Sequence, residues 1–198
     1  NNLYVASNRG RDKTAIYEFN IDKVQEGELI FEDEKVDVSD LMFSRKRKVL
    51  TGVSYNRAKR KRVFFDDWRG DIQIKLEAQL PGYEIGITSF SKNETKAIVV
   101  AYSDKSRGEY YFYNTETNKL TSLGKISPWL NEDHMAEMVP IVYTSRDGLT
   151  INGYLTIPKG SDGKNLPIVV NPHGGPWARD SWGYNPEIQF LANRGFAV

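Results

Sequence analysis

The sequence has no cysteine and only two histidines, and both shortages exclude classes of function. Without cysteine there is no disulfide framework, no cysteine-based zinc site and no thiol nucleophile. Two histidines leave little room for a histidine-rich metal site. We therefore expect neither a metal ion nor another cofactor.

An excess of charge of either sign is also lacking. The 198 residues carry 27 Lys and Arg against 26 Asp and Glu, a net charge of +1, whereas nucleic-acid-binding proteins are usually strongly basic. Nine basic residues do gather between positions 45 and 62, but seven acidic residues precede them between positions 26 and 40. We interpret these runs as neighbouring strands of opposite charge rather than as an anion-binding patch, and we expect no nucleic acid partner.

Long hydrophobic runs are absent as well. No run approaches the ~18 apolar residues of a membrane-spanning helix, and the first residues lack the charged and apolar regions of a signal peptide. The sequence therefore predicts a soluble protein without a membrane span, cytoplasmic or periplasmic, whose compartment the composition does not identify. Hydrophobic residues make up 39% of the chain, which is enough for a packed core, so extensive disorder is not expected.

What the sequence does contain, over its first 125 residues, is a series of short strands with alternating apolar residues. Three units begin near residues 3, 49 and 97, and each has an apolar strand, a polar turn, an aromatic strand and a weaker fourth strand such as Lys119–Leu123. A period of about 45 residues built from four strands is typical of β-propeller blades, whereas an immunoglobulin-like sandwich would lack this period. We predict about three four-stranded blades of a partial propeller in residues 1–126.

One segment interrupts the repeats. Ile72, Leu76 and Leu80 are spaced four residues apart, which predicts a short helix, and Pro81 with Gly82 would end it. We interpret it as an insertion between blades.

The pattern changes after residue 126. Residues 127–138 are predicted to be a linker, and residues 139–198 the opening of an α/β domain. Asp147-Gly148 predicts a hairpin turn because this pair accepts positive φ angles. The expected elements are two hairpin strands, a strand buried on both faces and a helix, at Val139–Ser145, Leu149–Ile157, Leu166–Val170 and Pro186–Arg194.

The motif that carries chemistry follows the predicted buried strand. It consists of His173, Gly174, Gly175, Pro176 and Trp177. Two glycines allow the backbone to approach a bound atom closely, and proline restricts the loop. A His-Gly-Gly loop after an early strand can supply an oxyanion-hole N–H in α/β-hydrolases. The alternative is an ordinary Gly-Pro turn with a packed histidine.

These segments together resemble the prolyl oligopeptidase family of serine peptidases, closest to its acylaminoacyl-peptidase and dipeptidyl-peptidase-like branch. The resemblance rests on residues 147–155, on Leu166–Trp177 and on Gln189–Val198, and it follows the family order of a β-propeller before an α/β-hydrolase domain. It implies that the Gly175 N–H is an oxyanion donor. It also implies that His173 shapes the loop and is not the base of the catalytic triad.

The sequence departs from the family pattern in lacking the triad. No serine stands in a Gly-x-Ser-x-Gly motif, and the other histidine, His134, precedes the loop and is in the wrong order for the base. We therefore expect Ser, Asp and His beyond Val198, and we expect the chain to be an inactive fragment of a longer serine peptidase.

Several functional expectations follow from the resemblance. The substrates would be short peptides, because a propeller restricts access, and a homo-oligomer of the full-length enzyme is compatible with it. The alternatives are a carboxylesterase-type hydrolase with the same loop and a non-catalytic propeller scaffold that binds proteins. Trp177 and Trp182 follow the loop, and we expect them either to line a substrate pocket or to lie in a core or domain interface.

Overall fold

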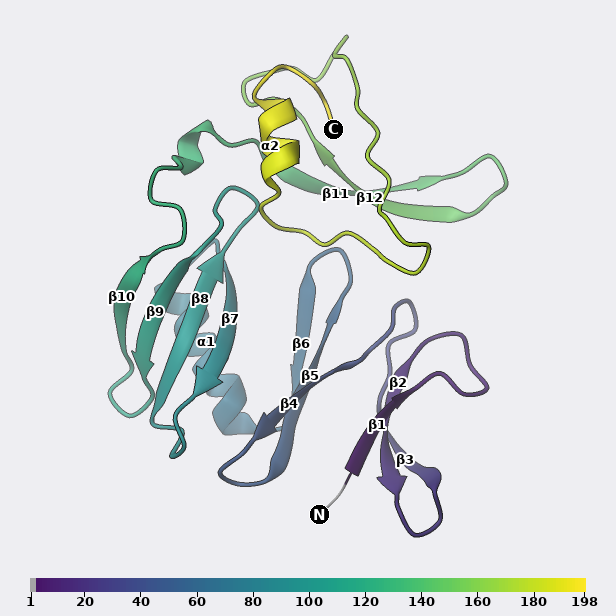
Figure 1. The fold of residues 1–198 in the computed structure, drawn as a ribbon, viewed down its shortest axis with the longest axis vertical. Helices are drawn as coiled ribbons and strands as arrows, with labels where there is room; N and C mark the ends of the chain where they lie inside the picture. Colours follow the sequence, from purple (N-terminus) through teal and green to yellow (C-terminus); the bar gives the residue numbers. More distant parts are fainter. Residues whose placement is uncertain (1–2) are drawn as a thin grey trace. The chain divides into compact units, whose positions relative to one another are not determined.

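The computed structural model describes residues 3–198, which form several antiparallel sheets and two α-helices (Figure 1). Asn1 and Asn2, which the predicted propeller segment includes, lie outside the described residues. The chain divides into two compact units, Asn1–Leu76 with Lys92–Glu94 and Glu77–Ser91 with Thr95–Val198. No helix of residues 3–198 is long and apolar enough to cross a membrane.

The first unit contains two three-stranded antiparallel sheets with the orders β1-β2-β3 and β4-β5-β6. Their strands are β1 (Leu3–Ser7), β2 (Ala15–Asn20), β3 (Gln25–Phe31), β4 (Asp40–Ser44), β5 (Val49–Asn56) and β6 (Arg60–Phe64). Ile16 of β2, Val53 of β5 and Val38 are fully buried in one cluster, against which Phe31 and Tyr55 also pack. Apolar burial therefore joins the two sheets into one unit.

Ion pairs also join the acidic and basic runs of this unit. Arg57 contacts Asp33 at 2.7 Å, and Arg60 contacts Asp40 at 2.6 Å. Burial raises the pKa of Asp33, but hydrogen bonds from the Lys35 N–H and from Arg57 outweigh it, so this pKa lies below its ordinary value. The predicted compensation of opposite charges is confirmed for these pairs.

Helix α1 (Asp67–Gln79) confirms the predicted helix, and Ile72 and Leu76 are buried. Asp66 caps its first turn, since its carboxylate accepts a hydrogen bond from the Arg69 N–H at 2.9 Å. The chain thus turns into a helix directly after β6. The prediction of four strands in each sequence repeat is wrong for the sheets β1-β2-β3 and β4-β5-β6, which have three strands each. After β6, the third strand of the second sheet, the chain continues into α1.

The second unit begins with a four-stranded antiparallel sheet of order β10-β9-β8-β7. Its strands are β7 (Glu84–Phe90), β8 (Lys96–Tyr102), β9 (Glu109–Asn114) and β10 (Lys119–Lys125). Alternate residues of β8, namely Ala97, Val99 and Ala101, are buried, as the period of two in a strand requires. This sheet has the four strands predicted for each sequence repeat, and none of the sheets in residues 3–198 closes on itself.

The three sheets correspond when they are aligned on their predicted hairpins. The pairs β1–β2, β5–β6 and β8–β9 are the apolar and aromatic strands recognised in the sequence. Strand β4 precedes its hairpin as β7 does, and β3 follows its hairpin as β10 does. Strands β3, β4 and β7 were not individually predicted.

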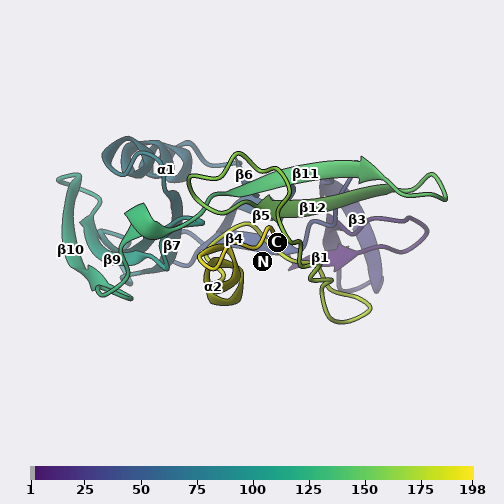
Figure 2. The same cartoon turned by 90° about the horizontal axis from the view of Figure 1, so that it is seen from above.

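A long hairpin follows the 3₁₀ turn η1 (Glu132–His134). It consists of β11 (Met138–Thr144) and β12 (Thr150–Thr156), which pair over their whole length (Figure 2). The predicted turn is confirmed, but of the pair Asp147-Gly148 only Gly148 has a positive φ, which is 88°. Asp147 instead hydrogen-bonds the Ser145 hydroxyl.

The predicted buried strand at Leu166–Val170 is wrong in its extent and burial. Only Ile168 forms a bridge, parallel to Ala197, and the side chains of Ile168 and Val170 are 70% and 83% exposed. Val198 in turn exchanges two backbone hydrogen bonds of 2.9 Å with Thr156 of β12. The arrangement is the start of a mixed sheet, but no described element covers the two exposed side chains.

Helix α2 (Pro186–Ala192) completes the chain's secondary structure and confirms the helix predicted there, although it ends two residues earlier. Asn185 caps it by accepting hydrogen bonds from the Glu187 and Ile188 N–H groups. Proline at the first helical position suits its N-terminus, and Gly195 follows the helix with a φ of 90°.

Candidate functional site

The His-Gly-Gly loop leaves the segment that pairs with Ala197 and continues to α2. The Val169 N–H donates to the Ala197 carbonyl at 2.8 Å, directly before the loop. Residues 171–181 are exposed throughout. The predicted loop residues therefore share one solvent-facing segment whose start is anchored by parallel pairing.

Gly175 has the unusual backbone of this loop. Its φ is 130°, a value that side chains rarely permit, whereas Gly174 does not have a positive φ. A Cβ atom on Gly175 would lie 2.8 Å from the Trp177 nitrogen and 3.1 Å from the Ala178 nitrogen. Both the backbone angle and the nearby chain thus require glycine at this position.

His173 contacts the same loop. Its Nδ1 lies 2.7 Å from the Gly174 carbonyl oxygen. Because a carbonyl only accepts, this contact requires the proton on Nδ1. The other histidine, His134, lies in η1 and lines a separate cavity of about 450 Å³ with Lys159 and Asn193.

The two tryptophans that follow the loop have different surroundings. Trp177 is 95% exposed. Trp182 is partly buried, and its Nε1 donates to the Met138 carbonyl at 2.8 Å. Trp182 lines a cavity of the second unit. The ring of Trp177 faces solvent, and the choice between a pocket-lining and an interface position stays a prediction for this residue.

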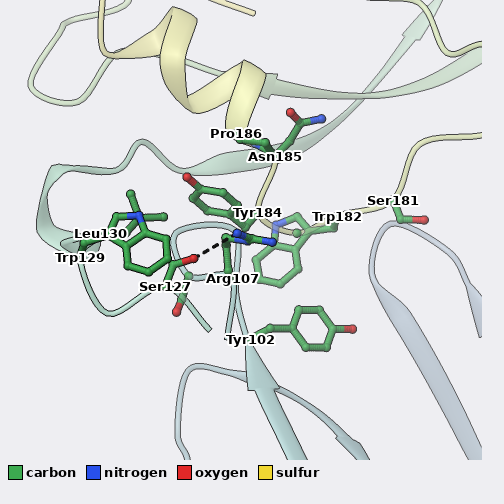
Figure 3. A pocket seen from close by; sticks show the side chains of 12 residues that line it. Tyr102, Arg107, Ser127, Trp129, Leu130, Ser181, Trp182, Tyr184, Asn185 and Pro186 are labelled. Carbon is green, nitrogen blue, oxygen red and sulfur yellow. Dashed lines mark hydrogen bonds between the residues drawn. The ribbon is translucent and has the colours of Figure 1, made fainter. Parts of the chain in front are cut away.

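A larger cavity of about 720 Å³ lies within the second unit (Figure 3). Its walls come from the end of β8 and the β8–β9 connection, from the residues after β10, and from the segment that enters α2. The lining residues are mostly aromatic or hydroxylic, with a single cation: Tyr102, Ser106, Arg107, Ser127, Trp129, Leu130, Ser181, Trp182, Gly183, Tyr184, Asn185 and Pro186. The sequence prediction missed this site because its parts are up to about 80 residues apart.

Buried side-chain hydrogen bonds hold the elements that surround this cavity. The Gln189 amide nitrogen of α2 donates to the carbonyls of Asp104 and Ala136 at 2.9 and 2.8 Å, and its oxygen accepts from the Ala136 N–H at 2.9 Å. The Asp104 carboxylate accepts from the Met138 N–H at 2.7 Å. Gln189 and Asp104 are each 6% exposed. We call these bonds the Gln189 junction.

Tyr83, close to β7, adds a contact to η1. Its hydroxyl donates to the Glu132 carboxylate at 2.9 Å. Burial, together with this hydrogen bond and the charge of Glu132, raises the pKa of Tyr83 to about 12. The protonated phenol is therefore the form that the fold stabilises.

Metal-binding groups do not gather anywhere in the described part of the chain. Residues 3–198 contain no group of three or more His, Cys, Asp or Glu side chains placed to hold a metal ion. The groups described at the candidate loop and its neighbouring cavity are backbone N–H groups, the His173 imidazole, hydroxyls, aromatic rings and one guanidinium.

Comparison with known proteins adds to this geometry. Scanned against models of known protein families, the chain matches none. Dipeptidyl aminopeptidase BIII of Pseudoxanthomonas mexicana is 32% identical over 211 residues, which cover 99% of this chain and 29% of that protein. The similarity thus includes both the sheets and the His-Gly-Gly loop.

Solved structures agree in fold. A prolyl endopeptidase structure matches with a TM-score of 0.70 and 17% identity, over 99% of this chain and 29% of that one. A puromycin hydrolase matches with a TM-score of 0.66 and 18% identity, over 100% and 31%. An acylaminoacyl peptidase is also among the matches. The predicted resemblance to the prolyl oligopeptidase family is confirmed.

The chain spans about three tenths of the length of these relatives. The named relatives are peptidases or hydrolases, and this agrees with the enzyme class that the loop predicted.

Proposed function

We propose that this chain is part of a serine peptidase of the prolyl oligopeptidase family that hydrolyses short peptides. The observation that carries the proposal is the positive φ of Gly175 in a His-Gly-Gly loop that directly follows a parallel-paired segment. The similarity to a dipeptidyl aminopeptidase along almost the whole chain supports it.

The same proposal assigns the domains. Residues 1–126 would be blades of a β-propeller, residues 127–138 a linker and residues 139–198 the opening of an α/β-hydrolase domain. The correspondence of the hairpins in the three sheets supports the first assignment. The pairing of Val198 with β12 and the parallel bridge between Ile168 and Ala197 support the assignment of residues 139–198 to an α/β-hydrolase domain, because parallel pairing accompanies an α/β arrangement.

In this mechanism the loop acts through its backbone. When a serine attacks a peptide carbonyl, negative charge develops on the carbonyl oxygen, and the Gly175 N–H would donate a hydrogen bond to it. One such donor stabilises the transition state by about 3–4 kcal/mol. His173 would restrain the loop, since its Nδ1–H donates to the Gly174 carbonyl, and the family resemblance assigns it this role rather than that of the base.

The nucleophile, its base and the aspartate would come from sequence outside these residues. The chain has no Gly-x-Ser-x-Gly motif, and the N–H donors of an oxyanion hole cannot form an acyl-enzyme without a nucleophile. Residues 1–198 alone would therefore be inactive.

A fluorophosphonate probe, which labels activated serines, tests this proposal. The intact protein should be labelled and should hydrolyse short peptidyl-nitroanilides, whereas a chain of residues 1–198 should do neither. Labelling of the 198-residue chain would show that the nucleophile lies within it. An intact protein that is folded but neither labelled nor active would favour a non-catalytic role.

A further inference from the structure

We propose that the cavity beside Arg107 binds the terminal carboxylate of a short peptide together with the apolar or aromatic side chain of its last residue. The choice of a peptide as the ligand rests on the proposed peptidase function. The choice of a carboxylate and an apolar group rests on the walls of the cavity itself.

The charge of the cavity comes from Arg107 alone. No Asp or Glu is among its lining residues, and none of the ion pairs in residues 3–198 involves Arg107. Its Nη1 donates to the Ser127 hydroxyl at 3.1 Å, and Ser127 is 6% exposed. A neutral hydroxyl orients the guanidinium without neutralising it, so the group keeps its charge and further N–H donors for an anion.

The connection that presents Arg107 is restrained before any ligand arrives. The Ser103 hydroxyl accepts hydrogen bonds from the Lys105 and Ser106 N–H groups, each at 3.1 Å. Gly108 has a φ of 113°, and a Cβ there would lie 2.8 Å from the Ala101 carbonyl oxygen. A site that is already ordered loses less entropy on binding.

Aromatic rings form the other walls. Figure 3 shows the guanidinium of Arg107 among the side chains of Trp129, Trp182 and Tyr184. The hydrogen bond from Trp182 to the Met138 carbonyl holds its ring in place. Trp129 is 76% exposed and thus presents its ring to an incoming group. The volume of about 720 Å³ lies within the range of small-molecule sites.

These features favour a carboxylate over a phosphate. A guanidinium pairs in a bidentate way with either anion. A single cation balances a singly charged carboxylate, whereas a phosphate monoester would bring excess negative charge against aromatic walls. A peptide terminus supplies both the single charge and the apolar group.

Calorimetric titration of the intact protein with 3-phenylpropionate tests the site. This acid has no peptide bond, so binding does not depend on catalysis, and a failed titration is distinguishable from a failed labelling by the fluorophosphonate probe. The matched ligands are 3-phenylpropionamide, which lacks the charge, and phenyl phosphate, which carries more of it. The matched variants are Arg107→Gln and, on the exposed β11–β12 turn away from the cavity, Arg146→Gln.

We expect the acid to bind in the millimolar range or tighter. The amide should bind at least about ten-fold more weakly, and Arg107→Gln should weaken acid binding by at least about ten-fold, because a charge-assisted hydrogen bond is lost. Arg146→Gln should leave binding unchanged. Absence of acid binding, equal binding of the amide, tighter binding of phenyl phosphate, or full binding by a folded Arg107→Gln variant would each overturn the proposal.

Discussion

The Gln189 junction and the His-Gly-Gly loop lie in the same compact unit but are built in opposite ways. The junction is buried, and its side-chain amide and carboxylate satisfy backbone groups far away in the chain. The loop is exposed, and its distinctive feature is the backbone angle of one glycine. We therefore expect a change in the junction to lower stability and leave the proposed catalysis largely intact. A change in the loop should lower catalysis and leave stability largely intact.

Gly175→Val in the intact protein should have the largest effect. Valine opposes the φ of 130° and would bring its Cβ within 2.8 Å of the Trp177 nitrogen, so the N–H would no longer be presented as before. We expect kcat to fall by about 10²–10³, the loss typical of one oxyanion donor, with little change in Tm because the loop is exposed.

His173→Ala is the control within the same loop. It should lower kcat less than Gly175→Val, because the histidine is assigned to loop shape and not to proton transfer. Steady-state kinetics and thermal melts on both variants decide the matter. If His173→Ala is the more damaging and leaves the fold intact, the assignment of His173 is wrong.

Gln189→Leu should lower the stability of the protein and leave kcat largely unchanged, the opposite of what is expected for Gly175→Val. It removes three hydrogen bonds and leaves the Asp104 carbonyl and both backbone groups of Ala136 without these partners. We expect the free energy of unfolding to fall by about 2–3 kcal/mol, because buried polar groups that lose their partners carry the full cost of desolvation. Chemical unfolding of the intact protein measures this loss.

Phe190→Tyr is the matched control on the same helix, at a side chain that is 54% exposed. It should change the free energy of unfolding by less than about 0.5 kcal/mol. Equal stability of the Gln189→Leu and Phe190→Tyr variants would contradict the structural role of the junction. So would a Gln189→Leu variant that keeps its stability but loses kcat.

Tyr83→Phe should have the smallest effect and a pH-dependent one. The folded pKa of about 12 lies above the ordinary tyrosine value of 10.0, so the fold stabilises the protonated phenol. This contribution is fully present below about pH 10 and is lost as the pH rises toward about 12.

Unfolding by urea across this pH range measures the slope. The parent protein should lose stability with rising pH more steeply than Tyr83→Phe. Part of the pH dependence should remain in both proteins, because burial and Glu109 also raise the pKa of Tyr111 to about 12. Identical slopes for the two proteins would show that Tyr83 does not contribute to the contact with η1.

Local patterns were predictable where neighbouring residues decide the structure. The β11–β12 turn follows from Gly148, which tolerates a positive φ, and α1 follows from the spacing of Ile72 and Leu76. The strand at Leu166–Val170 was predicted less well, because an apolar run becomes a strand only where a partner strand pairs with it. Here the described pairing is limited to the residues around Ile168.

The same distinction between local and long-range interactions applies to the candidate site. The sequence by itself determined the His-Gly-Gly motif and the resemblance it carries, since both are properties of consecutive residues, whereas the structure showed that Gly175 is the glycine with the positive φ. Only the tertiary structure decided that Gln189 reaches Asp104, 85 residues away, and that Arg107 shares a cavity with Trp182. Contacts of that kind depend on how sheets and helices pack, and no local spacing in a sequence encodes which distant backbone groups will need a partner once they are buried.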